Sequence, residues 1–262
     1  MSSASSPNAA SGAAPSAESG VRHIVGLSGG KDSTALALRL QELHPEREFE
    51  FLCTPTGDEL PEMLAHWEKL ECLLGKPLTR VTNGTLSGWI EEWDKLPSWR
   101  MRWCTQVLKI MPTVAFLKRN APAVLYVGLR ADEPPEARRG LQIDFAGVSV
   151  EFPLREWRWG LAEVRSYLRA RGVSIPRRTD CARCYGQRLG EWEDLYHRHP
   201  EIYADAASQE EATGHTFRSP GRDSRPAALK DLARTFSQGP LPMLGDPTDD
   251  EGEVSACRVC RL

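Results

Sequence analysis

The residues best suited to chemistry form a short polar run, Ser28-Gly29-Gly30-Lys31-Asp32-Ser33, between an apolar segment and a segment of helix-forming residues. The two glycines let backbone N–H groups turn toward an anion, because no Cβ obstructs them. The N-terminus of the following helix would face the same place. A Walker A loop, by contrast, has G-x-x-x-x-G-K followed by Ser or Thr, whereas Asp32 follows Lys31 here. The run therefore predicts a phosphate-binding loop of a different kind.

The cysteines form a second set of residues with chemical potential. Two C-x-x-C pairs, Cys181/Cys184 and Cys257/Cys260, account for four of the seven. Each pair places two sulfurs close enough to share one metal ion, and both pairs together predict a tetrahedral sulfur site. Zn²⁺ at that site would attach the C-terminal segment to the body, and a [4Fe–4S] cluster also accepts four cysteines. Two separate pairs of reduced thiols are the plainer alternative.

Alternating strands and helices must position these residues. Apolar segments at 23–27, 49–53, 78–82 and 123–130 predict strands, and helix-forming segments lie between them. This order predicts an α/β fold, a parallel sheet with helices on both faces. Three polar loops follow predicted strands, at 28–33, 54–62 and 130–138. Because ligands bind outside the carboxyl ends of such strands, we expect these loops to form one site.

Composition indicates how the chain is organised. It has 262 residues, a net charge of −3 and no apolar run of membrane-spanning length. Residues 1–20, rich in Ser, Ala, Pro and Gly, lack a signal-peptide pattern and predict a disordered tail of a cytoplasmic protein. We expect residues 21–195 to form one domain that carries the predicted phosphate-binding loop, and residues 196–262 to form a Cys-bearing helical arm. We expect that arm to be loosely packed from Thr216 onward and to return to the body through Cys257 and Cys260.

Several motifs resemble a known family. S-G-G-x-D-S resembles the PP-loop of adenine nucleotide alpha hydrolase-like ATP pyrophosphatases. Further segments resemble the phosphoadenosine phosphosulfate (PAPS) reductase branch, and they occur in that family's order. They are PTGDELPEM (55–63), WCTQVLKIMP (103–112), VGLRADEPPEAR (127–138) and FPLREWRWGLAEVRSYLRARGVSIP (152–176). The resemblance covers residues 21–195.

The resemblance implies roles for individual residues. Ser28, Gly29, Gly30, Asp32 and Ser33 would hold the phosphates or sulfate of the nucleotide, with Lys31 adding charge. Gly57 and Asp58 would lie near the adenosine or ribose. Lys109, Arg130 and Arg138 would face phosphate or sulfate oxygens. In relatives with iron–sulfur centres, the position matching Cys104 and a later C-x-x-C supply ligands, so Cys104, Cys181 and Cys184 with one tail cysteine form an alternative metal set.

Three functions follow as hypotheses. In the first, the protein binds ATP with Mg²⁺, splits it to AMP and pyrophosphate, and activates an acceptor for sulfur transfer from a sulfur donor, with Cys104 or the metal centre handling sulfur. The second is reduction of PAPS or adenylylsulfate with a thioredoxin-like partner, although the reductases' E-C-G-x-H segment is not found in this sequence. The third is a non-catalytic nucleotide-binding component of a DNA-modification or defence system. The basic segment 177–188 is the strongest indication of nucleic acid.

Overall fold

A parallel sheet forms the centre of the molecule. The computed structural model describes residues 20–134 and 146–239. Its sheet has five strands in the order β3-β2-β1-β4-β5, and every neighbouring pair is parallel. The strands are β1 (Arg22–Gly26), β2 (Phe49–Cys53), β3 (Leu78–Arg80), β4 (Ala123–Tyr126) and β5 (Val148–Glu151). The predicted α/β class is confirmed.

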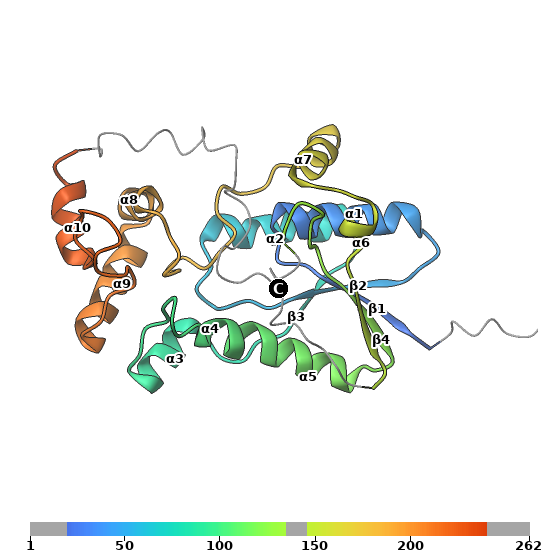
Figure 1. The fold of residues 1–262 in the computed structure, drawn as a ribbon, viewed down its shortest axis with the longest axis horizontal. Helices are drawn as coiled ribbons and strands as arrows, with labels where there is room; N and C mark the ends of the chain where they lie inside the picture. Colours follow the sequence, from blue (N-terminus) through green and yellow to red (C-terminus); the bar gives the residue numbers. More distant parts are fainter. Residues whose placement is uncertain (1–19, 135–145, 240–262) are drawn as a thin grey trace, which may run out of the picture.

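Helices cover both faces of the sheet (Figure 1). On one face lie α1 (Lys31–Leu43), α2 (Pro61–Leu74), the short α6 (Pro153–Glu156) and α7 (Leu161–Ala170). Along the other face run α3 (Leu86–Trp93), α4 (Trp103–Thr105), the π-helix η1 (Gln106–Ile110) and α5 (Met111–Arg119). Within the described residues, every helix is too short or too polar to cross a membrane.

The strands are apolar on both sides because each face is covered. Successive residues alternate between the two cores, as strand geometry requires. In β1, Val25 packs with the α1, α2 and α7 side chains, whereas Ile24 packs with Phe116 and Leu117 of α5. Edge strand β5 was not predicted from the sequence. Its residues are only partly buried or exposed, so it lacks the continuous apolar run that marked the central strands.

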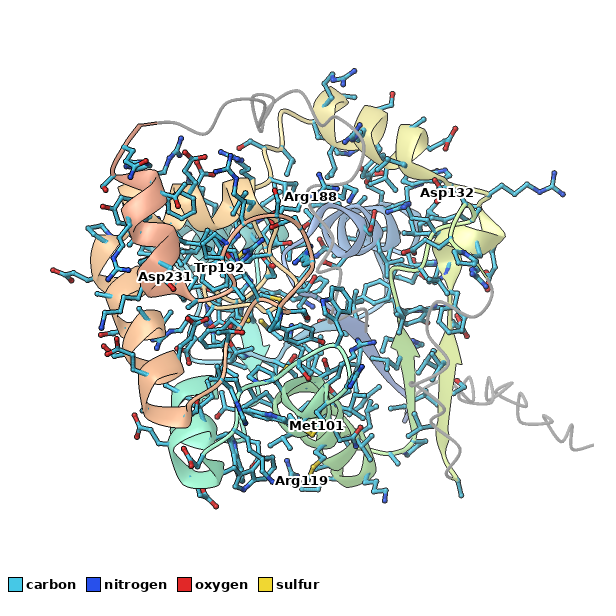
Figure 2. All side chains as sticks on the ribbon, turned by 60° about the vertical axis from the view of Figure 1, so that its left-hand side comes forward. Met101, Arg119, Asp132, Arg188, Trp192 and Asp231 are labelled. Atoms are coloured by element: carbon cyan, nitrogen blue, oxygen red, sulfur yellow. The ribbon has the colours of Figure 1, made fainter. Side chains whose placement is uncertain are left out.

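A second apolar core lies beside the sheet. Helices α8 (Leu189–Arg198), α9 (Pro200–Thr213) and α10 (Leu229–Phe236) stand together at one end of the molecule. Trp192 is fully buried between them and is labelled in Figure 2. The prediction of loose packing from Thr216 onward is wrong for Phe217 and for α10, because Phe217, Leu229 and Phe236 are buried in this core, whereas residues 220–226 are exposed. Leu229, Leu232 and Phe236 stand at helical spacing and predict a short amphipathic helix, but spacing does not show which core that helix joins.

Candidate nucleotide-binding site

The loop between β1 and α1 has the shape of an anion cradle. Gly29 adopts φ +84°, a backbone conformation that side chains disfavour. A Cβ at Gly29 would lie 2.3 Å from Met63 Cε and 2.8 Å from Trp67 Nε1. The first α1 hydrogen bond runs from Thr34 N to Gly30 O at 3.0 Å. The amides just before Thr34 therefore have no intrahelical partner and lie where an anion would bind.

Helix α2 fixes the carbonyls of this loop. Trp67 Nε1 donates to Ser28 O at 3.1 Å, and His66 Nε2 lies 3.0 Å from Gly29 O. Burial lowers the pKa of His66 and so favours the neutral ring, whose Nε2–H donates because a carbonyl only accepts. With both carbonyls bound by α2, the opposite side of the loop is left to its N–H groups and to the Ser28 and Ser33 hydroxyls, which lie 3.1 Å apart.

Three charged side chains lie together at the start of α1. Asp32 Oδ2 accepts from Arg130 Nη1 at 2.9 Å, and Lys31 Nζ lies 4.0 Å from the same oxygen. Burial raises the pKa of the Asp32 carboxyl, and the charges of Lys31 and Arg130 oppose that rise. Burial likewise lowers the pKa of Lys31. The arrangement brings Arg130, from the loop after β4, to the predicted phosphate loop, so these two of the three predicted loops lie together.

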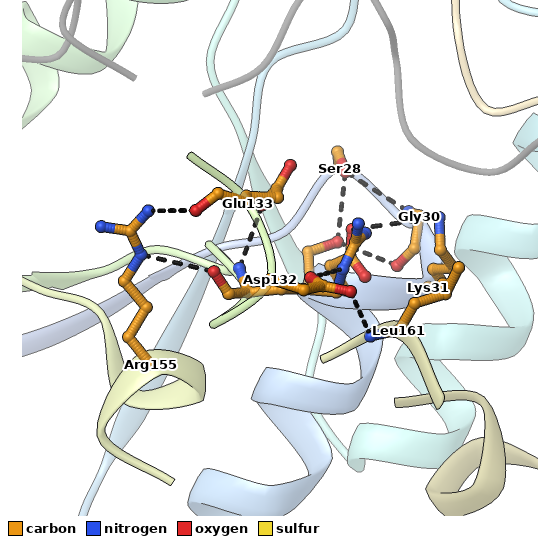
Figure 3. A network of polar contacts seen from close by, with 10 residues as sticks. Ser28, Gly30, Lys31, Asp132, Glu133, Arg155 and Leu161 are labelled. Atoms are coloured by element: carbon orange, nitrogen blue, oxygen red, sulfur yellow. Dashed lines mark hydrogen bonds and ion pairs between the residues drawn. The ribbon is translucent and has the colours of Figure 1, made fainter. Parts of the chain in front are cut away.

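The loop after β4 is held by α6 and α7 (Figure 3). Arg130 Nε donates to Asp132 Oδ1 at 2.8 Å, and the other oxygen of Asp132 accepts from Leu161 N at 2.9 Å. Arg155 Nη2 donates to Glu133 O at 2.9 Å. Gly128 lets the strand end approach α1 closely, since a Cβ there would lie 3.1 Å from Ser33 N. The guanidinium of Arg130 is therefore oriented before any ligand arrives.

The second predicted loop has a different internal structure. Glu59 Oε1 accepts from Thr56 N at 2.6 Å, and Glu59 Oε2 accepts from Gly57 N at 3.0 Å. Gly57 adopts φ +76°, and a Cβ there would lie 2.5 Å from Thr85 Cγ2. Asp58 is buried, and its carboxylate binds Ser87 and Arg183 rather than facing an open site.

Lys109 lies on the π-helix η1 and is partly buried. Burial and the charge of Glu59 raise the pKa of the Cys53 thiol, and Lys109 opposes that rise. Cys53 is the last residue of β2, so the charge of Lys109 acts on a group at the carboxyl end of that strand. The sequence did not reveal the π-helix, although such irregular turns are frequent at functional sites.

Cys104, Cys181 and Cys184 share the second apolar core, where each is at most 8% exposed. Cys184 N donates to Cys181 O at 3.2 Å, which makes the C-x-x-C segment a tight turn. In the described part of the chain, no group of three or more His, Cys, Asp or Glu side chains is close enough to hold a metal ion. The structure thus brings these cysteines into one cluster without gathering all three at one point. Arg138, Cys257 and Cys260 lie outside the described residues.

The basic segment 177–188 uses several of its arginines internally. Arg177 pairs with Asp194 at 2.6 Å, Arg178 with Asp180 at 3.3 Å and Arg183 with Asp58 at 2.9 Å. Arg178 is 6% exposed and donates to Cys181 O at 3.1 Å. These three cations stabilise the chain around the C-x-x-C turn, so the local charge that suggested nucleic acid is largely balanced by carboxylates.

Sequence reasoning missed the residues that support the site from other elements. His66, Trp67, Asp132 and Arg155 each fix a loop through a contact with a distant or neighbouring segment. His66 and Trp67 lie 37 and 39 residues from their carbonyl partners. In the sequence they appear only as two aromatic side chains with N–H donors on an amphipathic helix. That pattern does not indicate which carbonyls they bind.

Comparisons with known proteins identify the family of this chain. The model of the phosphoadenosine phosphosulfate reductase domain matches residues 22–177, more than half of the chain. An uncharacterized protein of Methanocaldococcus jannaschii is 26% identical over 195 residues, covering 69% of this chain. The chain spans only 39% of the length of that relative.

Among solved structures, PAPS reductase from Candida auris matches with a TM-score of 0.46 and 14% identity, covering 60% of this chain and 74% of that one. The U34-tRNA thiolase NcsA from Methanococcus maripaludis, with its [4Fe–4S] cluster, matches with a TM-score of 0.46 and 16% identity. The match covers 93% of this chain and 81% of that one. By its motifs and by the match over residues 22–177, the chain belongs to the phosphoadenosine phosphosulfate reductase domain family.

Proposed function

We propose that this protein binds an adenine nucleotide at residues 28–33, splits ATP between its α- and β-phosphates, and so activates an acceptor for sulfur transfer. The orientation of the loop carries the proposal. Because Trp67 and His66 bind the carbonyls of Ser28 and Gly29, the amides and the start of α1 remain for an anion. A polyphosphate suits such a cradle when a guanidinium, here that of Arg130, stands beside it.

Catalysis would be mainly electrostatic. Negative charge grows on the departing pyrophosphate, and the loop amides, the α1 N-terminus, Arg130 and Lys109 would stabilise it. Asp132 and Asp32 hold Arg130 in place, so little reorganisation is needed during the reaction.

Mg²⁺ fits the same place. Asp32 Oδ1 is buried and has no donor among the described residues, and a carboxylate oxygen is a ligand that Mg²⁺ prefers. Asp32 would therefore hold the ion, which when bound neutralises charge on phosphate oxygens.

The thiols would serve the sulfur chemistry. Cys181 and Cys184 would hold Zn²⁺ or a [4Fe–4S] cluster together with Cys257 and Cys260, or with Cys104 and one of those two, since thiolates suit both centres. A reducing compartment such as the cytoplasm would keep these thiols available. Cys104 or the metal centre would then accept sulfur from a donor, while a small-molecule nucleotide occupies the loop.

The burial of Cys104, Cys181 and Cys184 does not suit these three thiols to sulfonucleotide reduction. A reductase needs a thiolate that attacks sulfur and is then reached by a thioredoxin-like partner. Among the described cysteines, Cys104, Cys181 and Cys184 are buried, and exposed Cys72 lies near the far end of α2. Activation of an acceptor by ATP needs no such exposure of the thiols to a protein partner.

The test is pyrophosphate and AMP release from ATP and Mg²⁺ by anaerobically purified protein. Ser28→Ala and Asp32→Asn are expected to lower the rate by about tenfold or more, because each removes an interaction of at least about 1.4 kcal/mol. Ser237→Ala, an exposed serine after α10, serves as the matched control and should leave the rate unchanged. Sulfite release from PAPS would instead support reduction, and nucleotide binding without either product would support a binding component.

A further inference from the structure

The second loop and the C-x-x-C turn meet at one buried carboxylate. Asp58 follows β2, and its side chain is 3% exposed. A charge buried this deeply must be paired and hydrogen-bonded to be tolerated. Its partners therefore reveal what the residue holds together.

Those partners come from two separate segments. Asp58 Oδ2 accepts from Ser87 N at 3.0 Å, in the first turn of α3, and Oδ1 bonds Ser87 Oγ at 2.6 Å. Oδ1 also pairs with Arg183 Nη2 at 2.9 Å. The main chain adds a further contact, since Ala182 N donates to Asp58 O at 2.7 Å.

Ala182 and Arg183 are the two residues between Cys181 and Cys184. Asp58 thus binds both internal residues of the C-x-x-C turn, one through its carbonyl and one through its carboxylate. More than 120 residues separate these partners along the chain, so only the folded structure brings them together.

The contact also connects the turn to the phosphate loop. Residues 56–59 lead directly into α2, which begins at Pro61. One to two turns later, α2 supplies His66 and Trp67, which bind the carbonyls of the phosphate loop. The phosphate loop is thus bound to α2, α2 follows residues 56–59 in the chain, and Asp58 in that segment is bound to the C-x-x-C turn.

From these contacts we propose that Asp58 is a positioning residue that, through Arg183, fixes the Cys181–Cys184 turn at a set place relative to the nucleotide loop. It acts on the thiols through its contacts with Ala182 and Arg183. A role of Asp58 in sulfur transfer rests on the proposed function, whereas its role in fixing the turn is independent of that function.

Thiol reactivity tests the proposal without any nucleotide. The full chain is first freed of metal with a chelator and then treated with iodoacetamide, so that a bound metal does not protect the thiols, and alkylation of each cysteine is followed by peptide mass spectrometry. In Asp58→Asn and Arg183→Met, alkylation of Cys181 and Cys184 should accelerate by roughly 10- to 100-fold, because each variant loses one charge-assisted hydrogen bond that keeps the turn closed. Arg183→Lys keeps the charge and should restore most of the protection.

Internal controls separate release of the turn from general unfolding. Cys53, buried in β2, should stay protected, and exposed Cys72 should react at the wild-type rate. Ser87→Ala removes a hydroxyl from the same carboxylate but leaves its pair with Arg183, so the turn should stay closed. If Asp58→Asn also exposes Cys53, the result of Arg183→Met decides, because that variant breaks the same pair at its less buried partner.

Two results would overturn the proposal. One is wild-type alkylation of Cys181 and Cys184 in Arg183→Met. The other is equal acceleration in Ser87→Ala, which would make Asp58 a cap of α3 only. ATP affinity and cleavage are measured separately, so failure of the proposed function leaves the thiol result interpretable.

Discussion

Replacing Gly29 by alanine gives the sharpest test of the anion cradle. The new Cβ would meet Met63 Cε at 2.3 Å and Trp67 Nε1 at 2.8 Å, at a backbone φ of +84°. The left-handed conformation costs an L-residue roughly 1–2 kcal/mol. Displacing Trp67 loses its hydrogen bond to Ser28 O, worth about 1 kcal/mol. The native loop shape is therefore disfavoured by about 2–3 kcal/mol, which corresponds to a loss of nucleotide affinity of roughly 30- to 150-fold.

Isothermal titration calorimetry with ATP and with PAPS measures this loss. The matched control is Gly172→Ala, because Gly172 also has a positive φ, +63°, but no described atom lies within 4 Å of its Cβ position. That variant should lose about 1–2 kcal/mol of stability from the backbone alone and keep its nucleotide affinity. Wild-type affinity in Gly29→Ala would refute the cradle, since the loop would then tolerate the side chain that its geometry excludes.

Three further predictions follow from the charged and sulfur-bearing groups. Arg130→Lys keeps the charge but loses the fork between Asp32 and Asp132, so calorimetry should show triphosphate affinity about tenfold weaker with little change in melting temperature. Burial raises the pKa of Glu210 from 4.5 to about 7, so the folded state binds a proton that the unfolded state has released. The free energy of unfolding should therefore fall by up to about 3 kcal/mol between pH 4.5 and 7, and Glu210→Gln should flatten that slope in urea titrations at pH 5 and 8. Metal analysis of anaerobic protein should show loss of zinc or iron in Cys181→Ser and Cys184→Ser but not in Cys72→Ser; equal metal content in all three would contradict a metal centre at this turn.

The sequence by itself determined the local features of the site. A glycine-rich turn between an apolar strand and a helix can adopt few backbone conformations. The loop at 28–33 and the start of α1 could therefore be predicted. The central strands were equally visible, because burial on both faces requires continuous apolar residues. The approach of the loop after β4 to the loop after β1 was expected, because loops converge at the carboxyl ends of parallel strands.

Only the tertiary structure decided which residues support these loops. His66 and Trp67 bind the phosphate loop because the crossover of α2 brings that helix beside it. Asp58 pairs with Arg183 of the C-x-x-C turn, a contact that its place in the second loop did not reveal. The physical reason is that hydrogen bonds and ion pairs between distant segments depend on packing of whole elements, which leaves no periodic or compositional trace in the residues that make them.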